Sequence, residues 1–216
     1  MNFSDILARR RAVNFFDTER DVPPALLEQM VHMAANAPSG FNLQPWNLIV
    51  LRGQEEKMRL RKVAMNQPKV SEAPVVFIVL ADTKGWEKGH PTLERNFSEM
   101  LAAGSMKEEQ REWFYGACRK LYGTSRDTEL AFGVKNTAFF AMSLMYAASS
   151  LGLDTHPMDG FNHEGVMREF GIPAERYWIP LLMAVGYFRP GETRPEPKWR
   201  KAYEDIVVRF DTPSQG

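Results

Sequence analysis

The sequence predicts one globular domain in which helices pack on a buried β-sheet. Two short apolar runs rich in β-branched residues, 47–52 and 75–82, have the composition of strands buried on both faces. A charged helical pattern over 55–65 separates them, and two strands joined through a helix are typical of an α/β unit. With 216 residues, the chain is long enough to bury a full core as a single domain.

The N-terminal forty residues predict two helices. Residues 2–11 form a short helix whose last turn is cationic, which suits the negative end of the helix dipole. A second helix opens at Pro23 and Pro24 and stops before Pro38. Its apolar residues recur at helical spacing: Leu27, Met30, Val31 and Ala34.

The middle of the chain predicts surface helices followed by one buried helix. Residues 84–127 mix aromatic and charged side chains, which favours amphipathic helices. Residues 134–151 are apolar almost all round and end at Gly152, so we expect them in the core or in a subunit interface.

The last third predicts one strand and an arm. The stretch "LDTHPMDGF" is rich in turn-forming residues and is expected to connect elements, with a short helix over 163–170 after it. Residues 178–188 predict a third buried strand despite Pro180 near its start. Residues 189–216 are rich in proline and scattered charge, so we expect an arm that lies over other structure.

Composition excludes several classes of function. Lys plus Arg equal Asp plus Glu at 27 each, so no overall field attracts nucleic acid or an anionic membrane. The longest apolar stretch, 137–153, is too short for a bilayer span, and the N-terminus lacks the order of a secretory signal. The single Cys118 excludes an intrachain disulfide and suits a reducing compartment, so we expect a cytoplasmic protein.

Common catalytic motifs are missing from the sequence. It has no G-x-G-x-x-G, Walker A, H-E-x-x-H or G-x-S-x-G pattern, and Cys118 has no evident histidine partner. The histidines lack metal-ligand spacing and are interpreted as surface or satisfied core residues: His32, His90, His156 and His163. We therefore expect no metal site.

Cations near both ends of the chain suggest a phosphate site. Arginines at 9–11 end the first helix, and Lys198 and Arg200 form "KWR" in the arm. A phosphate needs several charge-assisted hydrogen bonds, and the planar fork of arginine fits its oxygens. The alternative is that both clusters are merely solvated surface.

Amide side chains supply the second half of a possible site. Ser39, Asn42 and Gln44 follow the second helix, while Asn66 and Lys69 precede the second strand. Such donors and acceptors suit the edge of a planar heterocycle, and a flat ring with a phosphate tail is a flavin mononucleotide or a nucleotide. The alternative is a polar turn that caps a helix.

The motif order identifies a family resemblance. The stretches "RRRAVNFFD", "APSGFNLQPW", "NQPKVSEAPVVFIV", "HPMDGF" and "KWR" resemble the FMN-dependent nitroreductase family over nearly the whole chain. The resemblance implies an α+β fold with a mixed central sheet flanked by helices. It also implies an intertwined homodimer with two FMN sites at the interface, in which the C-terminal arms, 189–216, exchange between subunits.

Carried over by position, the resemblance implies where FMN is held. Arg10, Lys198 and Arg200 would hold the phosphate, Asn66 and Lys69 the pyrimidine edge, and the backbone of Asp159 and Gly160 would lie beside N5. The loop 38–44 would come from the other subunit. The remaining implied cofactor contacts are Arg11, Ala12, Asn14, Pro38, Ser39, Gly40, Asn42, Gln44, Pro157 and Met158.

Two positions depart from the family's common pattern. Many relatives carry a second cation where this chain has Asn14, and a serine where it has Ala12. If Asn14 faces the flavin N1, the site has one positive charge fewer than in those relatives. Reduced flavin, which concentrates negative charge near N1, would then be less stabilised.

The resemblance also implies the activity. NAD(P)H would pass a hydride to flavin N5, and a nitroaromatic, quinone or similar planar acceptor would then use the same pocket in a ping-pong mechanism. Phe114 and Tyr115 could stack on the acceptor, or could simply bury a helix. The open alternatives are a flavin carrier or redox sensor without nicotinamide turnover, and dehydrogenation or reductive dehalogenation on the same scaffold.

Overall fold

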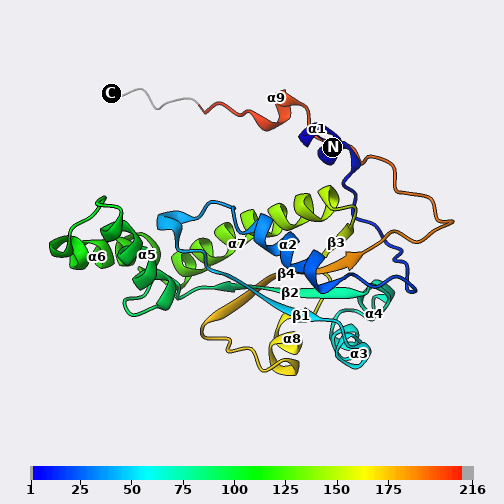
Figure 1. Ribbon diagram of the computed structural model, residues 1–216, viewed down its shortest axis with the longest axis horizontal. Helices are drawn as coiled ribbons and strands as arrows, with labels where there is room; N and C mark the ends of the chain where they lie inside the picture. The colour runs from blue at the N-terminus through cyan, green and yellow to red at the C-terminus, as the bar shows by residue number, and fades with distance from the viewer. Residues whose placement is uncertain (1, 211–216) are drawn as a thin grey trace.

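A four-stranded sheet forms the centre of the molecule in the computed structural model, which describes residues 2–210 (Figure 1). The strand order is β1-β2-β4-β3, and the fold is α+β. The strands are β1 (Trp46–Leu51), β2 (Val75–Asp82), β3 (Asp154–Met158) and β4 (Tyr177–Gly186).

Every strand pair in the described part of the chain is antiparallel, so the predicted mixed sheet and α/β unit are wrong there. The connection from β1 to β2 contains two helices, α3 (Gln54–Val63) and α4 (Pro68–Glu72), and we predicted only the first. Leu51 at the end of β1 pairs with Val76 at the start of β2, so the chain leaves and re-enters the sheet at the same end. For parallel strands, the connection would have to run back along the whole length of the sheet to the end where β1 begins.

Helices cover both faces of the sheet (Figure 1). The alternating side chains of β2 divide between the two layers, since Val75 and Phe77 pack towards α2 (Pro24–Ala34) and α7 (Arg126–Ser150) while Val76 and Ile78 face the other layer. That layer holds α3, α4 and α8 (His163–Glu169). β2 is buried on both faces as predicted, but β1 is an edge strand with Val50 exposed.

β3 was missed because its sequence reads as a connector. It is an edge strand, where a residue without an N–H, here Pro157, is tolerated. Pro180 lies in a central strand instead, and the register of β2 against β4 shifts between Val79 and Ala81, opposite it. That irregularity accommodates the missing donor.

The other helices lie around this core. α7 begins eight residues before the predicted helix, because Ser125 accepts a hydrogen bond from the Thr128 backbone and caps it. α5 (Pro91–Ala102), the short 3₁₀ turn Glu108–Gln110 and α6 (Arg111–Tyr122) form a separate lobe at one end of the sheet (Figure 1).

The arm leaves the body after β4 and runs beside the N-terminal helix α1 (Phe3–Arg9) (Figure 1). The Arg194 guanidinium makes two hydrogen bonds to the buried Asp154 carboxylate, at 2.7 and 2.8 Å, and so anchors the arm to β3. Beyond this anchor the arm contains a short helix, α9 (Tyr203–Ile206), and Phe210 is 87% exposed. Residues 211–216 of the predicted arm lie outside the described residues.

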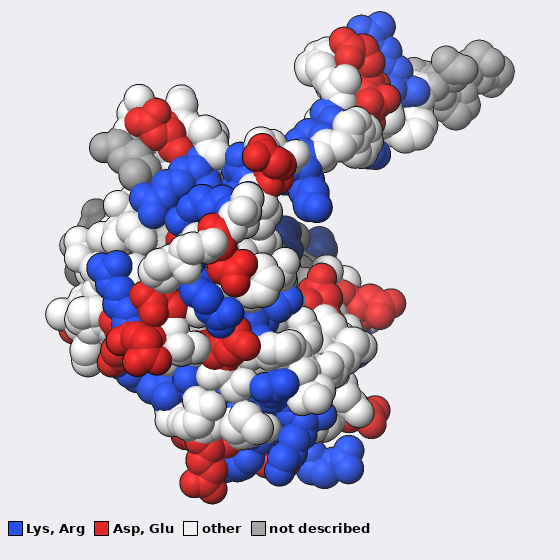
Figure 2. Space-filling view, turned by 90° about the vertical axis from the view of Figure 1, so that its right-hand side faces the viewer, with Lys and Arg blue, Asp and Glu red and all other residues white. Residues whose placement is uncertain are grey.

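Charges of both signs are interspersed on the face shown in Figure 2. Among residues 2–210, no helix is both long and apolar enough to cross a membrane. The same residues contain no group of three or more histidine, cysteine, aspartate or glutamate side chains placed to hold a metal ion.

Candidate functional site

Cations from the two ends of the chain line one pocket of about 580 Å³. Arg10 and Arg11 enter it from the end of α1, and Lys198 and Arg200 enter from the arm. The floor includes Tyr146 of α7. The meeting of these two clusters, predicted from the sequence, is therefore present within a single chain.

The arginines of this pocket have different partners. The Nη1 of Arg11 donates to the carbonyl oxygens of Ala8 and Arg10, at 2.7 and 2.9 Å, so this guanidinium satisfies the end of α1. Arg200 donates to the backbone carbonyl of Trp199 at 2.8 Å. No hydrogen bond or ion pair of the Arg10 side chain is found within the described residues, so its fork is available for an anion.

Next to this pocket, the chain after Arg11 runs beside β3. Ala12 and Thr155 form an isolated parallel bridge, and the Val13 amide donates to the Thr155 carbonyl at 3.2 Å. Ala12 thus leads from the cationic pocket to the edge of the sheet, while Asn14 is exposed just beyond it.

Lys69 reaches the same edge from α4. Its Nζ lies 3.3 Å from Nε2 of His156 on β3, and Nδ1 of His156 lies 2.8 Å from the Val13 carbonyl oxygen. Burial lowers the pKa of Lys69. Burial, and then the charge of Lys69, lower the pKa of His156, against a smaller raising effect of the Val13 hydrogen bond.

The turn after β3 lies against the segment before α4. Gln67 donates to the Gly160 carbonyl at 2.8 Å, and a Cβ on Gly160 would lie 3.3 Å from the ends of the Gln67 and Met65 side chains. The Met158 side chain is buried in the core, so only its backbone is available, whereas Asp159 is exposed. The Asn66 Oδ1 accepts from Arg61 at 3.0 Å.

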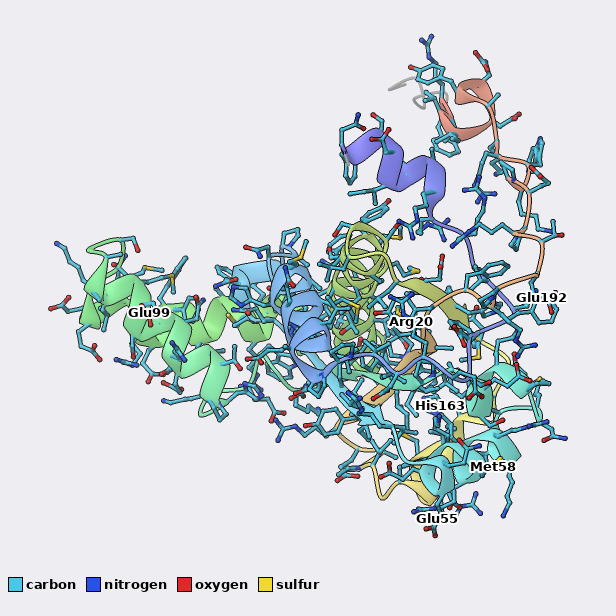
Figure 3. All side chains as sticks on the ribbon, turned by 45° about the vertical axis from the view of Figure 1, so that its right-hand side comes forward. Arg20, Glu55, Met58, Glu99, His163 and Glu192 are labelled. Atoms are coloured by element: carbon cyan, nitrogen blue, oxygen red, sulfur yellow. The ribbon has the colours of Figure 1, made fainter. Side chains whose placement is uncertain are left out.

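The loop containing Ser39, Asn42 and Gln44 lies elsewhere. It includes the 3₁₀ turn Gly40–Asn42 and leads into β1, whose first residue pairs with Ala81 at the far end of β2. An eight-residue strand spans about 26 Å at about 3.3 Å per residue, so the loop and Lys69 lie at opposite ends of the sheet. Figure 3 shows Glu99 on α5 and Met58 on α3 at opposite ends of the body of the molecule.

The loop before β1 and the segment before α4 both contain strained backbone. The non-glycine residues with positive φ in the described chain are Phe41, Asn42, Gln44, Met65 and Asn66, with φ between 45° and 54°. Each such residue costs about 1–2 kcal/mol relative to ordinary conformations, less for asparagine. All five fall in or next to the two amide-rich segments singled out from the sequence.

A family model described as the nitroreductase family matches residues 7–187. The chain belongs to the nitroreductase family. This confirms the resemblance seen in the sequence motifs.

Relatives in this family match most of the length of the chain. The Bacillus subtilis protein YodC, provisionally named an NAD(P)H nitroreductase, is 32% identical over 188 residues, which are 86% of this chain and 89% of YodC. A Thermus thermophilus protein named NADH dehydrogenase is 29% identical over 200 residues, 93% of this chain and 92% of that protein. A provisionally named nitroreductase from Exiguobacterium sibiricum, solved with FMN, aligns with a TM-score of 0.83 at 25% identity, over 97% and 98% of the chains.

The residues of this nitroreductase-family chain suit an FMN molecule. The cationic pocket matches a phosphate, and the half-buried Lys69 ammonium suits an electron-rich ring edge. Gly160 leaves its backbone open where a side chain would press against Gln67 and Met65. These three features lie along one edge of the sheet.

Two aromatic candidates have another role in this conformation. Phe114 is 0% exposed and Tyr115 7% exposed, and both pack in the α5–α6 lobe with Phe97 and Leu93. Phe114 cannot stack on a substrate from this position, so the packing alternative holds for it. Tyr115 donates its hydroxyl hydrogen to Glu94.

His156 of the candidate site was missed by sequence reasoning. It was interpreted as a satisfied core or surface histidine because no metal-ligand spacing surrounds it. The available signal was its place immediately before "PMDGF", which puts it on the strand leading to the candidate N5 turn.

Proposed function

We propose that this chain is an NAD(P)H-dependent FMN oxidoreductase that reduces a small planar acceptor such as a nitroaromatic or a quinone. The observation that carries the proposal is the pocket where Arg10 meets Lys198 and Arg200, continuous along the chain with the edge that presents Lys69 and Gly160. The names of YodC and the Thermus protein, and the FMN in the Exiguobacterium structure, support the nicotinamide and the cofactor.

The residues of the chain would bind and orient the cofactor. Arg10, Lys198 and Arg200 would hold the phosphate, with the backbone of Arg11 and Ala12 beside it. Lys69 would place positive charge at the pyrimidine edge, and Gly160 would allow its backbone to approach N5 closely. When bound, FMN supplies the redox chemistry by accepting hydride from NAD(P)H and giving it to the acceptor, so no acid–base pair of the protein is required.

A second copy of the chain would complete the site. The loop of Ser39, Asn42 and Gln44 lies at the end of β2 opposite to Lys69, so both cannot reach one flavin from the same chain. We propose a homodimer in which each loop covers the flavin of the other subunit. The exposed apolar side chains of the arm, among them Trp199 and Phe210, would then pack on the partner.

The binding part of the proposal is tested with phosphate-site variants. Arg10→Ala and Lys198→Ala should each weaken FMN binding by roughly 10-fold or more, because each removes a charge-assisted hydrogen bond worth about 1.5–3 kcal/mol. Arg168→Ala is the matched control, since Arg168 is an exposed arginine on α8, which packs on the other face of the sheet from the pocket. FMN affinity is measured by quenching of flavin fluorescence.

The activity is tested by rapid mixing of the FMN-loaded protein with NADH or NADPH. Bleaching of the flavin on a catalytic timescale, followed by reoxidation on adding an acceptor, supports the enzyme. A protein that holds FMN but is not bleached is a carrier or sensor. A protein that sediments as a single chain and takes up no FMN contradicts the proposal altogether.

A further inference from the structure

His156 lies outside every role proposed so far, yet it contacts two segments of the FMN site. Its Nε2 is 3.3 Å from Nζ of Lys69, and its Nδ1 is 2.8 Å from the carbonyl oxygen of Val13. Lys69 belongs to α4 and Val13 to the stretch that runs from the cationic pocket. The imidazole therefore bridges the two parts of the chain that would hold opposite ends of FMN.

The hydrogen-bond partners define the state of the ring. A backbone carbonyl can only accept, so Nδ1 of His156 carries the proton and donates it to Val13. Nε2 is then a lone-pair acceptor, and the Lys69 ammonium, which has only donors, supplies the hydrogen. A doubly protonated ring could not accept this hydrogen bond and would repel the ammonium.

The surrounding charges favour this neutral state. Lys69 is the charged group in contact with the ring, and both burial and this charge lower the pKa of His156. Asp154 is two residues earlier on the same strand, but its carboxylate is paired with Arg194. No carboxylate of the described chain therefore stabilises an imidazolium here.

We propose that neutral His156 is a positioning residue that holds the Lys69 ammonium where it meets the pyrimidine edge of FMN. This rests on the proposed function. One of the three N–H groups of Lys69 is used by His156, so two remain for the ligand. The hydrogen bond to Val13 fixes the orientation of the imidazole ring. The ring in turn holds Lys69 at a fixed position relative to the stretch that would bind the phosphate.

The inference predicts that His156 acts on FMN only through Lys69. In the otherwise unchanged chain, His156→Leu should weaken FMN binding at least about 5-fold, the lower end of coupling between sites. In a Lys69→Met background the same change should have less than about 2-fold effect, the limit for independent sites. His156→Gln, which retains a neutral acceptor, should restore most of the affinity.

The matched control is His163→Gln. His163 is also partly buried with its pKa lowered by burial, and its Nε2 accepts from the Ile179 amide, but no lysine contacts it. Its ring packs against Trp178 with 4.0 Å between ring centroids and an angle of 32° between the ring planes. A general loss of packing would affect both histidine variants, and thermal unfolding of the FMN-free proteins measures that loss.

A spectroscopic test does not need FMN. Histidine titrations followed by nuclear magnetic resonance should show His156 with a pKa below its ordinary value, which moves upward in Lys69→Met while His163 does not change. An unchanged His156 titration, or additive effects of the two substitutions on FMN affinity, would overturn the inference. If the unaltered chain binds no FMN, the proposed function fails, and the titration alone then decides the His156–Lys69 contact.

Discussion

At the scale of single residues, the proposed FMN site makes the number of positive charges along the β3 edge important, since they would stabilise reduced flavin. Lys69 is the cation observed there, and Asn14, just after Val13, is uncharged and exposed. Reduced flavin gathers negative charge near N1, so a second cation at position 14 would stabilise it further. A cation introduced at position 14 would therefore restore the second positive charge that many relatives carry there.

Asn14→Lys should raise the midpoint potential of bound FMN by about 20–40 mV. This corresponds to about 1–2 kcal/mol of added charge stabilisation for a two-electron couple. A potentiometric titration measures the shift, and Asn14→Gln serves as the neutral control. An unchanged potential would mean that residue 14 does not face the electron-rich edge of the ring.

At the scale of elements, the α5–α6 lobe holds the strained loop before β1. Asn96 of α5 donates to the Phe41 carbonyl and accepts from the Asn42 side chain. The Phe41 ring makes edge contacts with Phe114 and Tyr122. The lobe thus stabilises a backbone conformation that the loop would not adopt alone.

Removing the Asn96 side chain should release this loop. We expect Asn96→Ala to lower the free energy of unfolding by about 1–2 kcal/mol, as two hydrogen bonds to the loop are lost. FMN affinity should fall as well if the loop covers the flavin. Ser98→Ala is the control on the same helix, because Ser98 bonds only to the backbone of α5. Urea unfolding and FMN titration measure both effects, and equal results for the two variants would contradict a stabilising role of Asn96 for the loop.

The elements also show how far the sequence could be interpreted. β2 was predictable because its continuous apolar run reflects burial on both faces, and α7 because its apolar run is long, although Phe139 of α7 is 46% exposed. β3 was not, because an edge strand needs neither a continuous apolar run nor every N–H, and Pro157 argued against it. α4, in the connection between β1 and β2, was also missed, because a helix of five residues is too short to show a helical period.

Some residues of the candidate site could likewise be predicted from the sequence and others could not. Arg10, Lys198 and Lys69 could be chosen from their residue type and motif order. His156 could not, because its role depends on a contact with Lys69 across 87 residues of sequence. The burial of Phe114 likewise depends on which face of α6 packs against α5. The sequence of α6 does not define that face, because its aromatic residues lie on several sides of the helix.

At the scale of the whole molecule, Asp82 joins the sheet to the α5–α6 lobe. Its carboxylate accepts from Arg176 at 2.8 Å and contacts His90, the residue that caps α5, at 3.1 Å. Burial alone would raise the pKa of Asp82, but the hydrogen bonds from His90, Arg176 and the Lys84 amide hold it below its ordinary value.

This pairing predicts how acid affects stability. Because the folded-state pKa of Asp82 is depressed, its contribution is present above the ordinary value of 3.8 and is lost as the pH falls through the folded pKa. Asp82→Asn should cost about 3 kcal/mol at neutral pH, near the lower end for buried pairs because the Arg176 side chain is 42% exposed. Urea unfolding at successively lower pH should show this difference shrinking, and a constant difference would contradict the account.

The distance between the Ser39–Gln44 loop and Lys69 predicts that two inactive variants can complement each other. If each flavin is bound by Lys69 of one chain and the loop of the other, a variant altered in the loop and a variant lacking Lys69 would both be inactive alone. Refolded together, they would form hybrids in which one centre receives two intact halves and the other two damaged ones. Recovery of activity on mixing two dead proteins would therefore reveal that catalytic competence is shared between polypeptides.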